Sequence, residues 1–409
     1  MSTLAPLDGT IPPNDLSLLR RLGTKSASEG IKLWLVGGSV RDALMGVVPR
    51  DIDLVAESSS DKLAELLMVE PGDHIKNWSR FGTIKFNLSG RTVDFATARV
   101  ESYSNPGALP VVQPSTITDD LGRRDISINA MAVSLAPSDF GKILDLHGGL
   151  YDLEHRTIRV LHKSSFQDDP TRILRVVRYA TRFGFDLAQT TKSWLRRDRK
   201  HLASISKARI HRELMSILRE PNGTSALMFA HRLGVMKSLH PGLGEANVYS
   251  TLRRIQNLPL TPSNLLGLLI YCVPTYSVAD ITEHLGLTRV QADFGRAVRT
   301  VRSQESDVLK NAETMSNVDK CVGELSIDAL RISSIASPVK KVRDTMSAYI
   351  AGLRSSEPQL NGSDLLGLGF AEGPIIGQFL NELRGARLDG RVFSIEDEIS
   401  YAERFLESM

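Results

Sequence analysis

The 409-residue chain has few of the features that mark secreted or membrane proteins. Its two cysteines, Cys272 and Cys321, are isolated, which argues against a disulfide framework and a cysteine-based zinc site. No apolar run approaches the roughly 18 residues of a transmembrane helix, and the N-terminus has no basic flank with an apolar segment behind it. We therefore expect a cytoplasmic protein of two to four domains that has no membrane partner.

Net charge is also scarce, at +3, but the positive charge is concentrated in one region. Residues 161–220 contain fourteen Lys or Arg against six acids, so this window carries +8 and the rest of the chain about −5. Such a basic middle is typical of a surface that faces phosphates. A solvated, Arg-rich helical face has the same composition, and charge alone does not separate the two.

The pattern of apolar residues changes along the chain. It predicts four short strands in the first 150 residues, at 31–36, 51–55, 83–88 and 92–98. A helix is predicted at 59–67, residues 100–122 form the one long irregular stretch, and from about Asp169 a 3.6-residue period predicts helices almost throughout. We therefore expect an α+β fold, with a small mixed sheet that has helices on one face and an all-helical remainder.

Residues 35–54, LVGGSVRDALMGVVPRDIDL, combine a glycine turn with an aspartate pair. A strand that ends in Gly37, Gly38 and Ser39 and continues into a helix places bare backbone N–H groups where a triphosphate can bind. Asp51 and Asp53 lie two apart on a strand, so they share a face and can hold divalent cations. Together they predict metal-dependent phosphoryl or nucleotidyl transfer. Neither a P-loop nor a GxGxxG pattern is present.

This stretch resembles the signature of the polymerase-beta nucleotidyltransferase superfamily. In the form LVGGxVRDxLxGxxxxDxDLV it is similar to class II tRNA nucleotidyltransferases (CCA-adding enzymes) and bacterial poly(A) polymerases. Three further stretches resemble that family's motifs in the same order, and residues 361–390 resemble its tail more weakly. The three stretches are RRDISINAMA (123–132), DDPTRILRVVRYATRFGF (168–185) and ISKARIHRELMSIL (205–218).

The resemblance implies a Mg²⁺-dependent enzyme that adds the 3′-terminal CCA to tRNA from CTP and ATP. It implies a catalytic head at 1–150, a helical neck at 151–220, a helical body at 221–345 and a tRNA-binding tail at 346–409, with no obligate protein partner. The acceptor arm of tRNA would be held by phosphate contacts with the basic window and the helical C-terminus. An A-only or CC-only enzyme, a poly(A) polymerase and an inactive RNA-binding module remain as alternatives.

The head motifs supply candidates for metal, triphosphate and sugar. Asp51 and Asp53 would hold the metal, and Asp94 is a candidate third catalytic carboxylate, although it could instead pair with nearby Arg99. For RRDISINAMA (123–132), the alternative is that Arg124 and Asp125 form a local salt bridge with each other. The remaining candidates are Gly37, Gly38, Ser39, Arg41 and Arg124 for the triphosphate, and Asp125 and Asn129 for a sugar hydroxyl.

The third motif offers a reader of the nucleotide base. By resemblance Asp169 and Arg172 are the readers, because a carboxylate accepts from the amino group of C or A while a guanidinium donates to the ring nitrogen beside it. Arg175 and Arg178 follow on the same helical stripe as further substrate contacts. Asp169 before Pro170 is also an ordinary helix start, and Asp168 or Asp169 could pair with Arg172 on the same helix.

Three details of the resemblance concern nucleotide specificity and the residues that support the base-reading pair. Asp168 stands where the family usually has Glu, which shortens a supporting side chain. Arg209 and Glu213, one helical turn apart, are expected to form an ion pair that braces the base-reading helix. Residues 100–122 correspond to a loop that in this family helps the change from CTP to ATP, and the loop is not shortened here as it is in CC-only enzymes.

Overall fold

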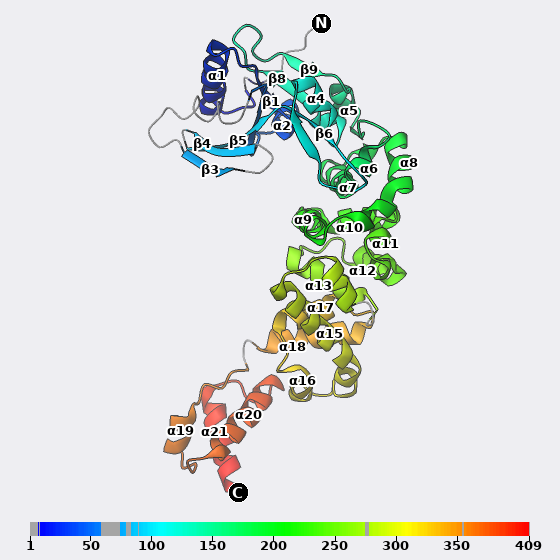
Figure 1. Ribbon diagram of the computed structural model, residues 1–409. Coiled ribbons are helices and arrows are strands. Elements are labelled where there is room, and N and C mark those ends of the chain that lie inside the picture. Colours follow the sequence, from blue (N-terminus) through cyan, green and yellow to red (C-terminus); the bar gives the residue numbers. More distant parts are fainter. Residues whose placement is uncertain are drawn as a thin grey trace. The chain divides into compact units, whose positions relative to one another are not determined.

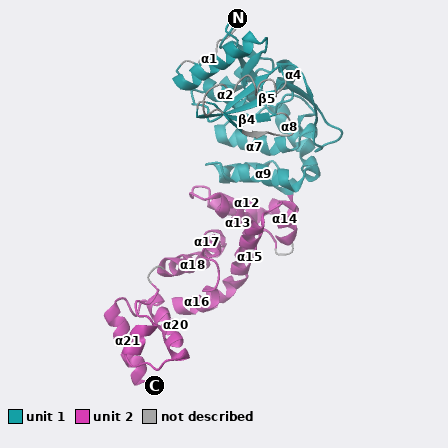
Figure 2. Ribbon diagram, turned by 60° about the vertical axis from the view of Figure 1, so that its left-hand side comes forward, with its two compact units in different colours: residues 1–239 teal, residues 240–409 magenta. Residues whose placement is uncertain are grey.

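The computed structural model describes residues 7, 9–58, 74–78, 83–88, 90–274, 278–353 and 356–408. The chain divides into two compact units, residues 1–239 and 240–409 (Figure 2). The helix predicted at 59–67 lies outside the described residues. The finer division into head, neck, body and tail stays a prediction.

A seven-stranded sheet forms the centre of the first unit (Figure 1). Its strands are β1 (Leu33–Val36), β2 (Ile52–Ala56), β3 (His74–Trp78), β4 (Thr83–Leu88), β5 (Arg91–Thr97), β8 (Met131–Ser134) and β9 (Ile143–Asp145). They run in the order β3-β4-β5-β2-β1-β8-β9, and each neighbouring pair is antiparallel except β2 with β5. The predicted mixed sheet and its four predicted strands, β1, β2, β4 and β5, are therefore confirmed.

Helices cover the sheet unequally on its two faces. One face packs its apolar side chains against α1 (Pro13–Ser28) and α2 (Gly38–Leu44). The other face carries Val55, which packs with the short helix α4 (Ile117–Gly122). Side chains alternate along a strand, so Asp53 points to the same face as Val55.

The stretch 100–122 is more regular than the sequence predicted. β6 (Arg99–Ser102) pairs with β7 (Val111–Pro114) in an antiparallel hairpin, and α4 follows it. Prolines hid the hairpin from the sequence pattern because they cannot donate to a strand ladder. Pro110 and Pro114 lie beside and at the end of β7, where a missing N–H disturbs pairing least.

Helices build the rest of the first unit. α7 (Thr171–Phe183) buries Ile173, Leu174, Val176 and Val177 and ends at Gly184, whose φ of 64° suits a glycine. Past Asp169 the described residues contain a single strand, the two-residue β11, which pairs in parallel with β10. The other elements are η1 (Ser127–Asn129), α5 (Gly149–Glu154), β10 (Thr157–Ile158), α6 (Ser165–Asp168), β11 (Asp186–Leu187), α8 (Gln189–Asp198), η2 (Arg199–Ser204), α9 (Lys207–Leu218), α10 (Gly223–Arg232) and α11 (Val235–Leu239).

The second unit is helical throughout its described residues, as predicted. Its C-terminal helices share a small core of their own, in which Phe370, Phe379 and Phe405 pack together. Across the described residues of both units, none of the helices is long and apolar enough to cross a membrane. The elements are α12 (Ala246–Arg254), α13 (Pro262–Cys272), α14 (Val278–His284), α15 (Arg289–Lys310), α16 (Met315–Val322), α17 (Ile327–Ala336), α18 (Lys340–Gly352), α19 (Gly362–Gly367), α20 (Pro374–Leu388) and α21 (Ile395–Glu407), with the 3-10 turn η3 (Pro241–Gly244).

Candidate active site

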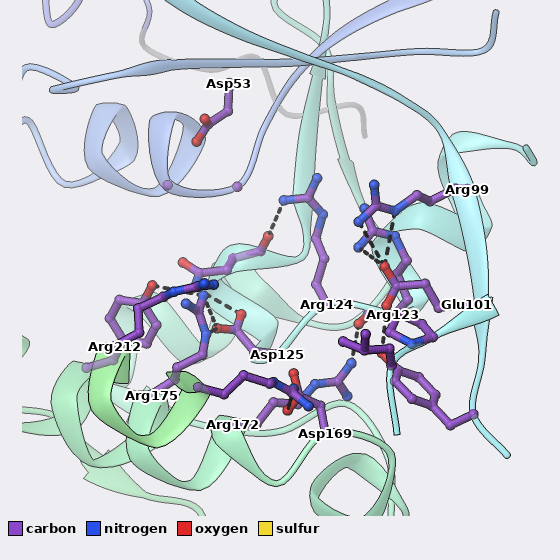
Figure 3. A pocket seen from close by; sticks show the side chains of 18 of the residues that line it. Asp53, Arg99, Glu101, Arg123, Arg124, Asp125, Asp169, Arg172, Arg175 and Arg212 are labelled. Atoms are coloured by element: carbon purple, nitrogen blue, oxygen red, sulfur yellow. Dashed lines mark hydrogen bonds and ion pairs between the residues drawn. The ribbon is translucent and has the colours of Figure 1, made fainter. Parts of the chain in front are cut away.

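A pocket of about 680 Å³ in the first unit gathers most of the predicted site residues. In Figure 3, Asp53 points into it from one side, Asp169 and Arg172 lie on the opposite side, and Arg124 extends between them. Asp51, Asp94, Ser39 and Arg178 do not line it. The lining residues are Gly37, Gly38, Arg41, Asp53, Arg99, Glu101, Tyr103, Leu109, Pro110, Arg123, Arg124, Asp125, Asn129, Asp169, Arg172, Arg175, Tyr179, Arg209 and Arg212.

The charge of the lining favours an anionic ligand. Eight of the lining residues are arginines, against the four acids Asp53, Glu101, Asp125 and Asp169. Guanidinium groups bind phosphate oxygens in a two-pronged geometry that lysine does not reproduce. The pocket therefore combines a phosphate-binding character with acidic groups at two opposite ends.

The glycine turn lets an arginine approach the backbone. Gly37 has a φ of 66°, a left-handed conformation that favours glycine. A Cβ at this position would lie 2.6 Å from the Nη1 atom of Arg124. Gly37 therefore meets two requirements at once, a left-handed backbone and room for the Arg124 side chain beside it.

Ser39 joins the glycine turn to the aspartates without reaching the pocket. Its Oγ donates a hydrogen bond to the carbonyl oxygen of Asp51 at 2.9 Å and accepts one from the N–H of Asp53, also at 2.9 Å. The residue is 2% exposed. The structure thus gives the Ser39 hydroxyl a position behind the carboxylates, where it holds their backbone.

The Asp53 carboxylate is destabilised by its surroundings. Burial, opposed by Arg124 and reinforced by the charges of Asp94 and Asp51, raises the pKa of Asp53 to about 6. No ion pair neutralises its charge within the described part of the chain. A carboxylate in this state is suited to bind a cation.

Asp94 lies directly across from Asp53 in the parallel pairing of β2 with β5. Its carboxylate oxygen Oδ1 lies 3.0 Å from the Nζ atom of Lys85, which is its neighbour on β4. The alternative expectation, a pair with Arg99, is wrong, because Arg99 binds Glu101 within the β6 strand. Asp53, Asp94 and Lys85 form one row across three strands.

In RRDISINAMA, Arg124 and Asp125 do not pair with each other; each forms an ion pair with another element. Arg124 pairs with buried Asp120 of α4 at 2.9 Å, whereas Asp125 pairs with Arg175 of α7 at 2.7 Å. Burial alone would raise the pKa of Asp125, but Arg175 and a hydrogen bond from Asn129 lower it to about 2. Asp125 is therefore ionised at any working pH.

Asn129 connects this motif to the first one. Its Nδ2 donates to Asp125 at 3.1 Å, and its Oδ1 accepts from Nη1 of Arg41 at 2.5 Å. Arg41 is 4% exposed and lies over the ring of Phe183. The sequence could not show that Arg41 links α2, η1 and α7, because these elements are far apart along the chain.

The predicted base readers face the pocket without binding each other's side chains. Asp169 Oδ1 accepts from the N–H of Thr171 at 2.9 Å, so the expectation of a helix start is also met locally. Arg172 donates to Oγ of Ser165 at 2.8 Å and to the carbonyl oxygen of Arg123 at 2.6 Å. The helix-cap role and the pocket-lining position therefore coexist in Asp169.

Supporting ion pairs differ from the expected ones. Arg209 binds Asp169 at 2.6 Å, not Glu213, so the expected pair within one helix is wrong. Glu213 instead lies 4.0 Å from Arg175 and 3.9 Å from Arg178, which leaves Arg178 turned away from the pocket lining. Both contacts join α9 to α7, which is the bracing that the sequence suggested, reached through other partners.

Asp168, which stands where the family usually has Glu, also has a partner outside the pocket. Its Oδ2 lies 3.7 Å from Nε2 of His162, and the pair is half-exposed. Burial lowers the pKa of His162, so this contact is between a carboxylate and a largely neutral ring at neutral pH. Within the described residues, no hydrogen bond or ion pair joins the Asp168 side chain to Asp169 or Arg172.

Several residues in and beside the β6–β7 hairpin take part in the pocket wall although the sequence did not predict them. Arg123 donates to Glu101 at 3.0 Å and to Asp120 at 2.6 Å, and Tyr103 donates to Glu101 at 2.6 Å. Burial raises the pKa of Tyr103, so this hydroxyl stays protonated and donates. The signal for Asp120 was present in the sequence, as an acid three and four residues before Arg123 and Arg124.

The carboxylates fit a divalent cation of the Mg²⁺ type. The described residues contain no group of three or more His, Cys, Asp or Glu placed to hold a metal ion. Magnesium is commonly bound by one or two carboxylates, while water and substrate phosphates complete its shell. Asp53, with Asp51 close enough to raise its pKa, matches that donor set.

Two family models match the chain. The model described as "Poly A polymerase head domain" matches residues 33–159, and the one described as "Probable RNA and SrmB- binding site of polymerase A" matches residues 184–246. The first match spans the glycine turn, the aspartates and RRDISINAMA.

Known tRNA nucleotidyltransferases are similar over almost the whole chain. The A-adding tRNA nucleotidyltransferase of Geobacter sulfurreducens is 31% identical over 97% of this chain, which spans about half (48%) of that relative. The CC-adding tRNA nucleotidyltransferase of Deinococcus radiodurans is 30% identical over 97% of this chain and 95% of its own length.

Solved structures of CCA-adding enzymes are also similar to this chain. A Thermotoga maritima CCA-adding enzyme complexed with tRNA has a TM-score of 0.82 and 28% identity, with 98% of this chain and 97% of that chain covered. CCA-adding enzyme structures with ATP and with CTP have TM-scores of 0.80 and 29% identity; they cover 98% and 97% of this chain, and 96% of each solved chain is covered. With a relative at 30% identity that is covered over 95% of its length, the chain belongs to the tRNA nucleotidyltransferase family of enzymes.

Proposed function

We propose that this protein adds the 3′-terminal CCA to tRNA, using CTP and ATP. The observation that carries the proposal is a single pocket that contains Asp53, the Gly37–Gly38 turn, Arg124 and the Asp169–Arg172 pair. These residues come from three separate motifs, and a nucleotide needs all of their chemistry at once. The triphosphate, the sugar and the base of the nucleotide then each have a candidate partner in the pocket.

At the triphosphate end, Arg124 would bind a phosphate oxygen. Asp120 holds Arg124 by accepting from both its Nε and its Nη2, so the guanidinium is oriented before a nucleotide arrives. Asp51 and Asp53 would hold Mg²⁺, which when bound activates the attacking 3′-hydroxyl and stabilises the leaving pyrophosphate. Asp94, held by Lys85, would orient that hydroxyl from the next strand.

At the sugar, Asp125 and Asn129 are the candidates. Asp125 is ionised and can accept from a ribose hydroxyl, while Asn129 carries both a donor and an acceptor. Arg175 and Arg41 fix the two side chains from opposite sides. This arrangement supports recognition of a ribonucleotide rather than a deoxyribonucleotide.

Asp169 and Arg172 would select the base. A carboxylate and a guanidinium match the amino group and the unprotonated ring nitrogen of C and A. U and G present a keto oxygen and a ring N–H at the same edge, so acceptor would face acceptor and donor would face donor. Selection therefore includes a repulsive component, which needs no nucleic-acid template.

The tRNA would be held mainly through its phosphates. The net charge of +8 in residues 161–220 supports binding of the acceptor arm to this basic window, and the helical C-terminus is proposed to extend that contact. Such binding reads shape and charge, not sequence, and weakens steeply with salt.

A-only addition is the second candidate function, because the Geobacter relative carries that name. CC-only addition is a third, given the Deinococcus relative. The β6–β7 hairpin, which lines the pocket through Tyr103, Leu109 and Pro110, favours an enzyme that accepts ATP.

The deciding experiment uses tRNA that lacks zero, one, two or three terminal nucleotides, with CTP and ATP supplied separately. Full CCA activity predicts CMP addition to the two shorter acceptors and AMP addition only to tRNA ending in CC. AMP addition alone would identify the A-only enzyme. CMP addition alone would identify a CC-only enzyme, and no incorporation at all would leave the RNA-binding module.

A further inference from the structure

Lys85 is a cation on the side of the aspartates that leads away from the pocket. It lies on β4 directly across from Asp94 of β5, which in turn lies across from Asp53 of β2. Of these three residues, Asp53 alone lines the pocket. The row therefore starts at the pocket and runs along the sheet toward its edge strand β3 (Figure 1).

The Lys85 ammonium group can hold a second anion besides Asp94. Its Nζ lies 3.0 Å from Oδ1 of Asp94, and its side chain is 42% exposed. The contact with Asp94 and the charges of Asp51 and Asp53 raise the pKa of Lys85, so the group stays charged at neutral pH. An ammonium has three N–H donors, so the contact with Asp94 leaves it able to bind a further anion from solution.

The surface around Lys85 is polar and half-buried, so water reaches it. Thr83, Lys85 and Asn87 share one face of β4, beside Thr92 and Asp94 of β5. The apolar residues between them turn to the opposite face, where they are buried in the main core of the first unit. This part of the sheet therefore offers a polar surface that carries a cation beside the proposed catalytic carboxylates.

The geometry of nucleotidyl transfer brings the acceptor to this surface. The attacking hydroxyl and the leaving pyrophosphate lie in line, on opposite sides of the phosphorus. Arg124 and the Gly37–Gly38 turn mark the pocket as the proposed triphosphate side. The 3′-hydroxyl then arrives from the other side, where Asp94 and Lys85 lie. The last phosphodiester of the acceptor follows one sugar behind that hydroxyl, and the aspartates would repel it if no cation stood beside them.

We propose that Lys85 binds the last phosphodiester of the acceptor RNA and thereby positions its 3′-hydroxyl. This inference rests on the proposed function, because it requires an acceptor with a free 3′-hydroxyl. Asp94 holds the ammonium group in place, and the ammonium offsets the repulsion between the aspartates and the incoming phosphate. The contact involves one phosphate and reads no base, so it applies to CCA, CC and A addition alike.

The test compares two acceptor RNAs on the unaltered full chain and on Lys85→Gln. One acceptor has an ordinary last phosphodiester, and the other has an uncharged methylphosphonate at that linkage. Both carry a 2′-deoxy sugar on the 5′ side of the linkage, because a 2′-hydroxyl there would cleave the methylphosphonate. The measurements are the Kd of the acceptor by fluorescence anisotropy, the KM of the acceptor and the KM of the nucleotide.

Lys85→Gln should weaken binding of the charged acceptor alone. We expect its Kd and KM to rise about three- to tenfold, as on loss of one partly exposed charged contact. With the methylphosphonate acceptor, Lys85→Gln and the unaltered chain should bind equally, because the contact is already lost. KM for CTP or ATP should stay the same, since Lys85 lies outside the pocket lining.

Salt dependence gives a second measurement of the same contact. One phosphate contact to a single strand contributes about 0.7 to the slope of log Kd against log salt, so Lys85→Gln should reduce the slope by about that amount. Lys85→Arg keeps the charge and should keep the slope. Lys32→Gln is the matched control, because Lys32 is an exposed lysine 3.5 Å from Glu57, outside both the row and the pocket lining.

Three outcomes would overturn the inference. The first is a loss in Lys85→Gln that is as large with the methylphosphonate as with the phosphodiester, since Lys85 would then act through Asp94 alone. The second is an unchanged salt slope in Lys85→Gln, and the third is an equal change in Lys32→Gln. If the unaltered chain incorporates no nucleotide, the proposed function fails, while the anisotropy comparison still decides whether Lys85 contacts the phosphate.

Discussion

Asp53 and Asp94 are direct neighbours across the parallel strands β2 and β5, on the face of the sheet that carries Val55. Burial is the main cost of ionising Asp53, and repulsion from the Asp94 carboxylate in this register adds to it. Together these effects raise the pKa of Asp53 to about 6. The carboxylate proposed to bind the metal therefore lowers the stability of the metal-free fold.

Asp53→Asn should stabilise the metal-free protein at neutral pH. Because its pKa is near 4 in the unfolded chain and about 6 in the folded chain, the folded state holds the extra proton between these values. Stability contributed by this group is therefore lost as pH rises from 4 to 6, by no more than about 3 kcal/mol. Urea titrations in EDTA at pH 4.5 and 7.5 should show the variant more stable only at the higher pH. A variant less stable than the parent at pH 7.5 would contradict this account.

Asp51→Ala should abolish incorporation of every nucleotide while leaving tRNA binding largely intact. Asp51 is exposed and lies immediately before β2, so its replacement removes a proposed metal ligand and little packing. Nucleotide incorporation and filter binding of tRNA are the two measurements. Retained activity would refute the metal assignment.

Arg172→Ala should relax base choice and also lower stability. The guanidinium holds α6 through Ser165 and the turn after α4 through the Arg123 carbonyl, and the loss of a buried charged hydrogen bond costs about 1.5–3 kcal/mol. Discrimination between CTP and UTP is the decisive measurement. If it stays unchanged while stability falls, Arg172 is only a structural residue.

Gly37→Ala should impair nucleotide binding through Arg124. The new Cβ would displace the guanidinium, which lies 2.6 Å from its position, so we expect KM for the nucleotide to rise about tenfold, as on loss of one charged contact. Gly30→Ala is the matched control, with a φ of 67° and nothing within 4 Å. Both should lose about 1–2 kcal/mol of stability from the left-handed backbone. A normal KM in Gly37→Ala would show that Arg124 does not bind the nucleotide from its observed position.

Ser39→Ala should loosen both aspartates. It removes the hydroxyl that joins the Asp51 carbonyl to the Asp53 N–H, at a cost of about 1–3 kcal/mol for the buried groups left unpaired. Mn²⁺ affinity, followed by electron paramagnetic resonance, should weaken. Ser26→Ala is the control, because Ser26 is equally buried but its Oγ has no partner in the described structure. Equal Mn²⁺ affinity in the two variants would remove the role given to Ser39.

Local sequence predicted much of the site because several requirements are local. A glycine before a helix, two aspartates two apart on a strand and the Asp-Pro start of α7 are set by neighbours in the chain. Ten of the predicted residues line the pocket, among them Gly37, Asp53 and Arg172. The β6–β7 hairpin was missed because its prolines break the alternation that identifies strands.

The partners of charged side chains were the least predictable feature. The sequence predicted Glu213 as the partner of Arg209 and offered Asp125 as an alternative partner of Arg124, in each case the nearest opposite charge along the chain. In the fold they bind Asp120 and Asp169 instead. An ion pair forms where tertiary packing brings two groups together out of water, and sequence distance says little about that.

The sequence by itself determined which chemical groups are available to the candidate site, because it fixes the types of side chain and their spacing within each motif. Only the tertiary structure decided which groups face the pocket and which hold others in place. Ser39 acts from behind the carboxylates and Arg209 connects two distant segments, since strand register and helix packing fix the direction of each side chain.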